Sequence, residues 1–185
     1  MTSPLIECEG VWWKINTEGS GIYSGMMRAI LGQLFAMLSH HNKVLVFRFD
    51  LSTPNYTNTN KEITDFLRRL SGRIKSHYKC ERIGHAWVRE QEKAKSQHYH
   101  FALILDGNKI QTVNLLWTWV KTCWEFTEGR AWRPKKPYYR LDRHDPTKTA
   151  EAVYRLSYLA KGRGKGYKPD QTKNYSTSRI KRKEG

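Results

Sequence analysis

Two histidines separated by one residue, His98 and His100, open an apolar run that continues to Leu105. The run has the composition of a buried strand, and successive side chains of a strand point to opposite faces. His98 and His100 therefore share one face, where two imidazoles can bind the same metal ion. A helical metal site would instead require histidines four residues apart. Taken alone, such a pair is more often a set of polar side chains at the end of a strand than a set of metal ligands.

A carboxylate can join the histidines from the preceding strand. Residues 86–90 have strand composition, and a short polar turn connects them to the histidine strand, which predicts an antiparallel hairpin. If Glu92 lies opposite His98 and Glu90 opposite His100, both carboxylates share the face of the imidazoles. A slip of one residue in the register would send both carboxylates to the other face.

A second candidate for chemistry is a pair of tyrosines, Tyr154 and Tyr158, in a helix expected over residues 145–162. At about 100° per residue, both tyrosines and Lys161 fall on one narrow face, opposite an aliphatic face. A free tyrosine has a pKa of about 10 and is a poor nucleophile when neutral, so a neighbouring lysine would have to help stabilise the phenolate. Lys161 suits that role. The alternative for both tyrosines is half-buried packing with the hydroxyl in water.

The elements around these residues predict a mixed α and β fold. An apolar stretch at 44–47 is typical of a central strand covered on both faces, and it leads to Arg48 and Asp50, which share one face. These two residues either contact a substrate or form a structural ion pair. Thr59 and Thr112 are the expected N-caps of two helices. Helices are expected at 22–38, 59–77, 112–129 and 145–162, and strands at 11–15, 44–51, 86–90, 98–105 and 138–142.

The chain is strongly basic: 33 Lys and Arg against 17 Asp and Glu give a formal net charge of +16. An excess of this size usually indicates a polyanionic partner, with nucleic acid as the first candidate and an anionic membrane as the second. No stretch supplies about 18 uninterrupted apolar residues, and the first ten residues lack the basic character of a signal peptide. We therefore expect no membrane association and a cytosolic protein.

Two basic segments are candidate phosphate contacts. Arg163 and Lys165 belong to a glycine-rich stretch that lacks the spacing of a Walker loop and that we interpret as a flexible arm, with plain disorder as the alternative. The basic residues of the 59–77 helix lie off its apolar stripe and form either a solvated face or a phosphate-contacting one: Arg68, Arg69, Arg73 and Lys75.

Two histidines and one carboxylate would leave coordination positions of a divalent cation open. Nitrogen ligands favour manganese, zinc or similar ions, and magnesium remains compatible. Beside a basic surface, such an ion suits phosphate chemistry, because it polarises a non-bridging oxygen and holds the scissile phosphate in place.

The order and spacing of these motifs resemble the HUH endonucleases. His98-Tyr99-His100 before an apolar strand is similar to their first motif, and Tyr154-x-x-x-Tyr158-x-x-Lys161 is similar to their second. Within that superfamily the chain most resembles the gene II-type replication initiators of filamentous phages (inoviruses) and their prophage relatives. The resemblance covers residues 44–161, with similar stretches at 48–51, 87–90 and 154–161.

This resemblance implies a set of roles for the site residues. His98 and His100 would be ligands of Mg²⁺ or Mn²⁺, with Glu90 as the third ligand and Glu92 in reserve. Such proteins cut single-stranded DNA at a replication origin, keep a 5′-phosphotyrosine and free a 3′-hydroxyl.

Tyr158 is the expected nucleophile, with Lys161 beside it. Tyr154 would serve a second cleavage or strand transfer, as in relatives with two tyrosines, or be merely structural, as in relatives with one. Candidate contacts to DNA are Arg48, Asp50, Arg163 and Lys165.

The implied fold is α+β, with a central antiparallel sheet of about five strands and flanking helices in a ferredoxin-like or RRM-like arrangement. We expect a single nuclease domain over residues 1–165, with its motif core at 44–161, and a basic tail at 166–185. The expected partners are single-stranded or supercoiled origin DNA and a helicase and polymerase of the bacterial host, in whose cytoplasm the protein would act.

The predicted function is initiation of rolling-circle replication of a phage or mobile element. The alternatives are a transposase or relaxase with the same chemistry, a basic DNA-binding regulator without catalysis, and an RNA-binding module that uses its aromatic side chains.

Overall fold

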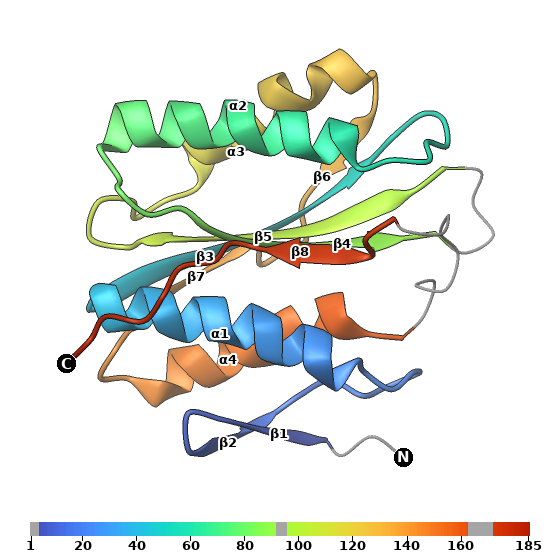
Figure 1. Cartoon of the computed structure of the whole chain (residues 1–185). Coiled ribbons are helices and arrows are strands. Elements are labelled where there is room, and N and C mark those ends of the chain that lie inside the picture. The colour runs from blue at the N-terminus through green and yellow to red at the C-terminus, as the bar shows by residue number, and fades with distance from the viewer. Residues whose placement is uncertain (1–3, 92–95, 163–171) are drawn as a thin grey trace.

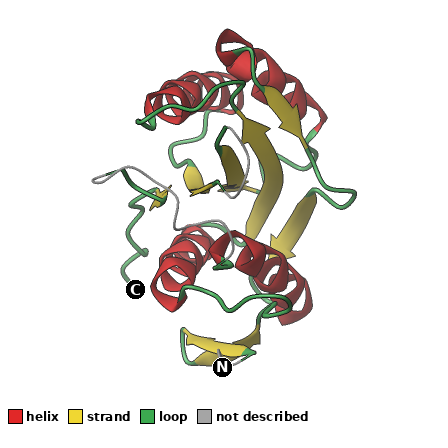
Figure 2. Ribbon diagram, turned by 90° about the vertical axis from the view of Figure 1, so that its right-hand side faces the viewer, coloured by secondary structure: helices red, strands yellow, loops and turns green. Residues whose placement is uncertain are grey.

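The computed structural model describes residues 4–91, 96–162 and 172–185. An antiparallel sheet lies between two layers of helices (Figures 1 and 2). The helices are α1 (Ser24–His40), α2 (Lys61–Tyr78), α3 (Asn114–Trp124) and α4 (Pro146–Leu156), with 3-10 turns η1 (Glu125–Thr127) and η2 (Ser157–Ala160). The strands are β1 (Leu5–Cys8), β2 (Val11–Lys14), β3 (Lys43–Ser52), β4 (Gly84–Glu90), β5 (His98–Asp106), β6 (Arg130–Trp132), β7 (Tyr138–Asp142) and β8 (Tyr175–Thr177).

Six described strands form the main sheet, in the order β6-β3-β5-β4-β8, with β7 also paired to β3. β6 and β7 share one edge of β3, because β7 pairs with its first half and β6 with its last residues. The β-α-β-β-α-β order of ferredoxin-like folds is followed by β3, α2, β4, β5, α3 and β7, with the short β6 added before β7 and with β5 and β3 at the centre of the sheet. The predicted α+β class with a central antiparallel sheet is confirmed.

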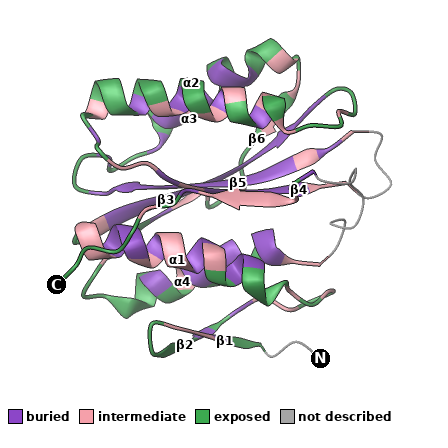
Figure 3. Cartoon of the chain, in the orientation of Figure 1, coloured by how far each residue is buried: buried purple, intermediate pink, exposed green. Residues whose placement is uncertain are grey.

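Each face of the sheet has its own hydrophobic core. α2 and α3 cover one face, where Phe49, Phe66, Phe101 and Trp124 form a cluster of aromatic rings. α1 and α4 cover the other face over smaller side chains of β3, β4 and β5. Figure 3 shows the resulting pattern, with buried strands between helices that are buried only on their inner sides. Because β3 and β5 are covered on both faces, a polar side chain within them needs a partner inside the protein.

Several helix boundaries differ from the expected ones: α1 is Ser24–His40 rather than 22–38, and α3 ends at Trp124 rather than at 129. The N-cap of α2 is Asn60 rather than Thr59, and the N-cap of α3 is Val113 rather than Thr112; neither cap residue makes a side-chain cap hydrogen bond. The start of α4 agrees with expectation, since Asp145 accepts a hydrogen bond from the Thr147 amide. Its end does not, because regular helix stops at Leu156 and η2 follows.

The sheet includes part of the segment that the sequence analysis sets apart as a tail. β8 pairs antiparallel with β4, with Tyr175 opposite Val88, so the domain continues beyond residue 171. At the other end of the chain, β1 and β2 form a separate hairpin that lies outside α1 and α4 (Figure 1). Among the described residues, no helix has the length and apolar character needed to span a membrane.

Candidate functional site

Strand pairing brings four of the candidate polar residues to one face of the sheet. Glu90 lies opposite His98, and Asp50 lies opposite His100. This register differs by two residues from the one that would place Glu90 opposite His100, so Glu90 stays on the face of the imidazoles. Glu92 lies outside the described residues.

His100 is the centre of a buried hydrogen-bonded group. Its Nδ1 lies 2.6 Å from Oδ1 of Asp50, and its Nε2 is hydrogen-bonded to Oε2 of Glu90. Arg48 forms an ion pair with Asp50 and also donates to the carbonyl of Phe49 at 2.9 Å. Three strands, β3, β4 and β5, thus hold one imidazole in a fixed orientation.

Burial and charge shape the titration of this group. Burial alone would raise the pKa of the Asp50 carboxyl, but the hydrogen bond with His100 and the charge of Arg48 outweigh it, so the pKa lies below its ordinary value. Burial lowers the pKa of His98, and the neighbouring His100 adds to this effect, whereas Glu90 and Asp50 oppose it. His98 is therefore favoured in the neutral form, which is the form that binds metals.

Tyr158 approaches this group from η2. Its ring stands nearly perpendicular to the ring of His100, with centroids 5.3 Å apart, and the Arg48 guanidinium lies 5.4 Å from the tyrosine centroid. The tyrosine is 44% exposed, although His100 is only 7% exposed. An accessible phenol thus covers a buried imidazole, which is the arrangement needed if a large substrate is to reach the tyrosine from outside.

The N-terminal segment holds η2 in place. The Asn16 amide donates to Oγ of Ser157 at 2.9 Å, and Ile22 forms an isolated backbone bridge with Lys161. Nζ of Lys161 donates to the Glu18 carbonyl at 2.6 Å while lying 5.8 Å from the centroid of the Tyr158 ring. Lys161 is therefore near Tyr158, as expected, but its ammonium group also fixes the chain before α1. Sequence analysis did not predict these contacts between the N-terminal segment and η2, because no local pattern links residues so far apart.

Tyr154, the second predicted tyrosine, lies near Tyr158 but not on His100. Tyr154 is 36% exposed and lines a small hollow with Tyr158, Asn16 and Tyr139. Within the described residues, Tyr158 rather than Tyr154 is the tyrosine whose ring packs on His100.

Arg48 and Asp50 form the structural ion pair that was one of the two alternatives, and both are buried. Their contact with DNA stays a prediction. Arg163 and Lys165 lie outside the described residues.

Trp132 is a neighbour of the site that sequence analysis did not find. It lies on β6 opposite Asp50, and its ring meets the ring of His98 at 77° with centroids 5.9 Å apart. Trp132 is 40% exposed, so it forms an aromatic wall beside His98 that solvent can reach. The only signal for it in the sequence is the aromatic residue itself, because its strand is three residues long.

The imidazole nitrogens of His98 and His100 and the carboxylate of Glu90 are suitable ligands for a divalent cation. In this structure, however, His100 and Glu90 lie at hydrogen-bonding distance from each other. In the part of the chain that the structure describes, no three His, Cys, Asp or Glu side chains are spaced to hold a metal ion as they stand. Ligand bonds of about 2.0–2.2 Å on each side would require His100 and Glu90 to move apart. The hydrogen bond from Nδ1 of His100 to Asp50 would persist, because a metal-bound histidine commonly donates its other ring N–H to a carboxylate.

The fold and this site define a class of protein: a ferredoxin-like α+β domain with a histidine and carboxylate group on its sheet and an exposed tyrosine above it. The model of the family described as YagK/YfjJ C-terminal domain matches residues 13–178, and the chain belongs to this family. The comparisons with curated proteins and with solved structures gave no match.

Proposed function

We propose that the protein is a metal-dependent endonuclease of the HUH type that nicks and joins single-stranded DNA through a covalent 5′-phosphotyrosine. The observation that carries the proposal is the packing of the exposed Tyr158 on His100, which Asp50 and Glu90 hold from neighbouring strands. A tyrosine, an oriented imidazole and a carboxylate are the groups that this reaction requires. Four separate elements of the fold supply them: η2 carries Tyr158, β5 carries His100, and β3 and β4 carry Asp50 and Glu90. The high net positive charge supports a nucleic-acid substrate.

In the proposed reaction the Tyr158 oxygen attacks the scissile phosphorus. The bond from phosphorus to the tyrosine oxygen forms, the bond to the 3′ oxygen breaks, and a proton lost from the phenol is matched by one taken up by the leaving 3′ oxygen. The positive charges of Arg48 and Lys161 lie near the ring and favour the negative charge that develops on the tyrosine. A divalent cation held by His98, His100 and Glu90 would polarise the non-bridging phosphate oxygen.

The biological role that we propose is initiation of rolling-circle replication of a phage or mobile element in the bacterial cytoplasm. A retained 5′-phosphotyrosine and a free 3′-hydroxyl give a host polymerase its primer. Unwinding would come from a host helicase. The retained phosphotyrosine also keeps the energy of the broken bond, so the same tyrosine site can rejoin the strand.

The test is formation of a covalent adduct with DNA. The protein is incubated with Mn²⁺ and labelled single-stranded oligonucleotides that tile the DNA carrying its gene, and adducts that survive denaturation are counted. We expect an adduct that requires the metal and is lost in Tyr158→Phe. Tyr56→Phe is the matched control, because Tyr56 has a similar exposure of 42% and comes from a loop. Absence of any adduct, or one that survives Tyr158→Phe combined with Tyr154→Phe, would overturn the proposal.

A second candidate function is a DNA-binding regulator without catalysis. The observation in its favour is that both ring nitrogens of His100 are already occupied by carboxylates, as in a structural group. For a regulator, replacement of His98 and His100 by alanine would leave DNA affinity nearly unchanged, and wild-type protein would form no adduct. For the enzyme, the same replacement would abolish the adduct.

A further inference from the structure

A basic surface lies on the opposite layer of the molecule from Tyr158. On the outer side of α2 and α3 there is an open hollow, here called the α2–α3 hollow, lined by Arg68, Arg69, Arg73, His77, Lys79 and Trp119. The candidate site lies on the sheet face that α1 and α4 cover, whereas α2 and α3 cover the other face (Figures 1 and 2). The two surfaces are therefore separated by the thickness of the sheet and one helical layer.

The positive charge of this hollow is largely unbalanced. Among the described residues, the carboxylate that pairs with the basic side chains of α2 is Asp65, which is bound by Lys61 at 2.6 Å and lies 3.7 Å from Arg68. No described ion pair reaches Arg69 or Arg73. The layer that holds α4 differs, since Glu151 there binds two lysines.

The spacing of Arg69 and Arg73 lowers the stability of α2. Arg69 and Arg73 are four residues apart in the middle of α2, and like charges at that spacing repel on a helix surface. Lys75 and His77 lie in the last turn, where the helix dipole favours cations, but that explanation does not extend to Arg69 and Arg73. An anionic partner would remove the repulsion.

The cationic side chains are also held in place before any partner binds. Nη1 of Arg73 donates to Oγ1 of Thr122 at 2.7 Å, and the Arg69 guanidinium lies 4.4 Å from the centre of the Phe126 ring. His77 packs edge-on against Trp119, with centroids 5.2 Å apart. Binding therefore loses less side-chain entropy than it would with freely moving arginines. Gly72 also lines the hollow, and there is open space where a side chain at this position would project.

We propose that the α2–α3 hollow binds the phosphate backbone of nucleic acid. From Arg68 to Lys79 the helix advances roughly 16 Å at 1.5 Å per residue. A DNA duplex of that length carries roughly ten phosphate charges, enough to engage every cation of the hollow. The half-buried Trp119, which also lines the hollow, offers an aromatic side chain for contact with a sugar or an unpaired base. This binding does not depend on the proposed nuclease activity, and it would hold DNA on the side of the protein away from Tyr158.

The test compares two double variants with the same change in net charge. Arg69→Gln with Arg73→Gln removes the central cations of the hollow, and Lys136→Gln with Lys148→Gln removes two cations paired with Glu151 on the other layer. Fluorescence anisotropy measures binding of a labelled duplex and of a labelled single strand over a range of KCl concentrations, and co-sedimentation measures binding to phosphatidylserine vesicles. Circular dichroism confirms that both variants are folded.

We expect the hollow variant to bind duplex about tenfold more weakly at 0.1 M salt, with a salt dependence reduced by about two phosphate contacts. The control should change less than twofold. A larger loss for duplex than for single strand identifies the duplex as the form bound, and the reverse result identifies the single strand. Equal affinities of the two variants for both DNA forms would overturn the proposal, as would a loss confined to binding of phosphatidylserine vesicles. A protein that forms no adduct but shows this difference would refute only the nuclease proposal.

Discussion

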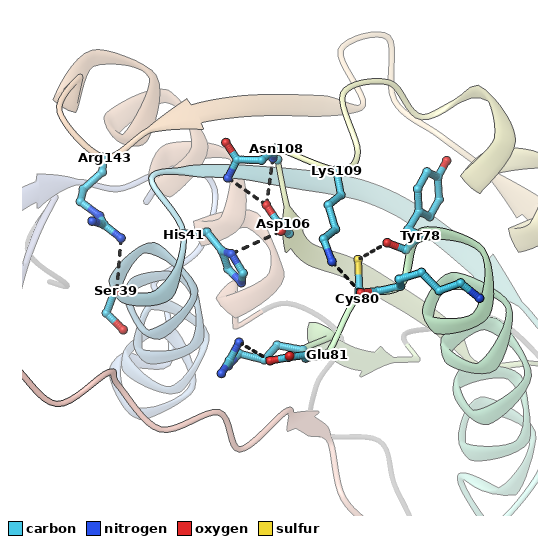
Figure 4. Close-up of polar contacts among 12 residues, drawn as sticks. Ser39, His41, Tyr78, Cys80, Glu81, Asp106, Asn108, Lys109 and Arg143 are labelled. Atoms are coloured by element: carbon cyan, nitrogen blue, oxygen red, sulfur yellow. Dashed lines mark hydrogen bonds and ion pairs between the residues drawn. The ribbon is translucent and has the colours of Figure 1, made fainter.

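The two ends of β5 carry the same pair of chemical groups in different settings. At its start, His100 is bonded to Asp50 and Glu90, and at its end Asp106 lies 3.4 Å from Nδ1 of His41. At the Asp106 end, Oδ1 also accepts hydrogen bonds from the backbone and side-chain nitrogens of Asn108 (Figure 4). That carboxylate is therefore committed to the turn that follows the strand.

The two ends of β5 differ in which elements supply the hydrogen-bond partners of Asp106 and of His100, and in the side chain that covers His100. Asn108 is two residues from Asp106, so the turn is a local structure. The partners of His100 come from β3 and β4, and the exposed Tyr158 lies above it. At one end of β5 the carboxylate of the pair is held by the turn that follows the strand, and at the other end the pair is combined with a potential nucleophile. The pair alone thus indicates no function, and the tyrosine distinguishes the two ends.

The largest expected difference between the two ends is in DNA cleavage. His100→Gln should reduce adduct formation with Mn²⁺ at least a hundredfold, because it removes a proposed metal ligand. His41→Gln should leave it within about twofold. Both are measured as initial rates of adduct formation on the same oligonucleotide. Equal losses in the two variants would show that the effect is one of general stability rather than of the site.

The contrast also explains what sequence analysis could and could not predict. The strands at 98–105 and 138–142 and the start of α4 depend on local periodicity and on the Asp145 cap, and they agree with the structure. The face of Glu90 depends only on the parity of the register, so it is correct although the pairing is shifted by two residues.

Contacts between distant segments could not be predicted in this way. The hydrogen bond between His100 and Asp50 requires β3 to pair with β5, and the hydrogen bond from Asn16 to Ser157 joins residues 141 positions apart. β8 was missed because three polar residues in a basic segment carry no strand pattern. The types and spacing of the residues were thus enough to select the members of the candidate site, whereas the neighbours that orient them depend on the tertiary fold.

The next expected difference is in stability. Asp50→Asn removes the charge that pairs with buried Arg48 and should lower the free energy of unfolding by about 3–5 kcal/mol. Asp106→Asn keeps an oxygen that can accept from Asn108 and should cost only about 1 kcal/mol. Urea denaturation at pH 7 measures both. If Asp106→Asn costs as much as Asp50→Asn, the two ends of β5 do not differ in the way proposed.

The last expected effect concerns a histidine between the two ends, on the neighbouring strand, and it is confined to acidic pH. His85 lies opposite Leu103 of β5, and burial lowers its pKa from 6.5 to about 4. Between these values the unfolded chain binds a proton that the folded protein does not, so stability falls as the pH drops from 6.5 towards 4 and is retained above 6.5. The loss amounts to about 3 kcal/mol at most.

His85→Gln should flatten the pH dependence of the unfolding free energy in this interval, because glutamine does not titrate. His144→Gln, which replaces an exposed histidine, is the control and should leave the dependence as in the wild type. Chemical denaturation at half-unit steps of pH measures the slope. Because the pKa of Asp50 lies below its ordinary value, the loss of its ion pair belongs to a lower pH range than that of His85. A wild-type slope that persists in His85→Gln would therefore assign the acid sensitivity to other histidines. His41 and His98, which lie at opposite ends of β5, would be replaced next, because burial lowers the pKa of both.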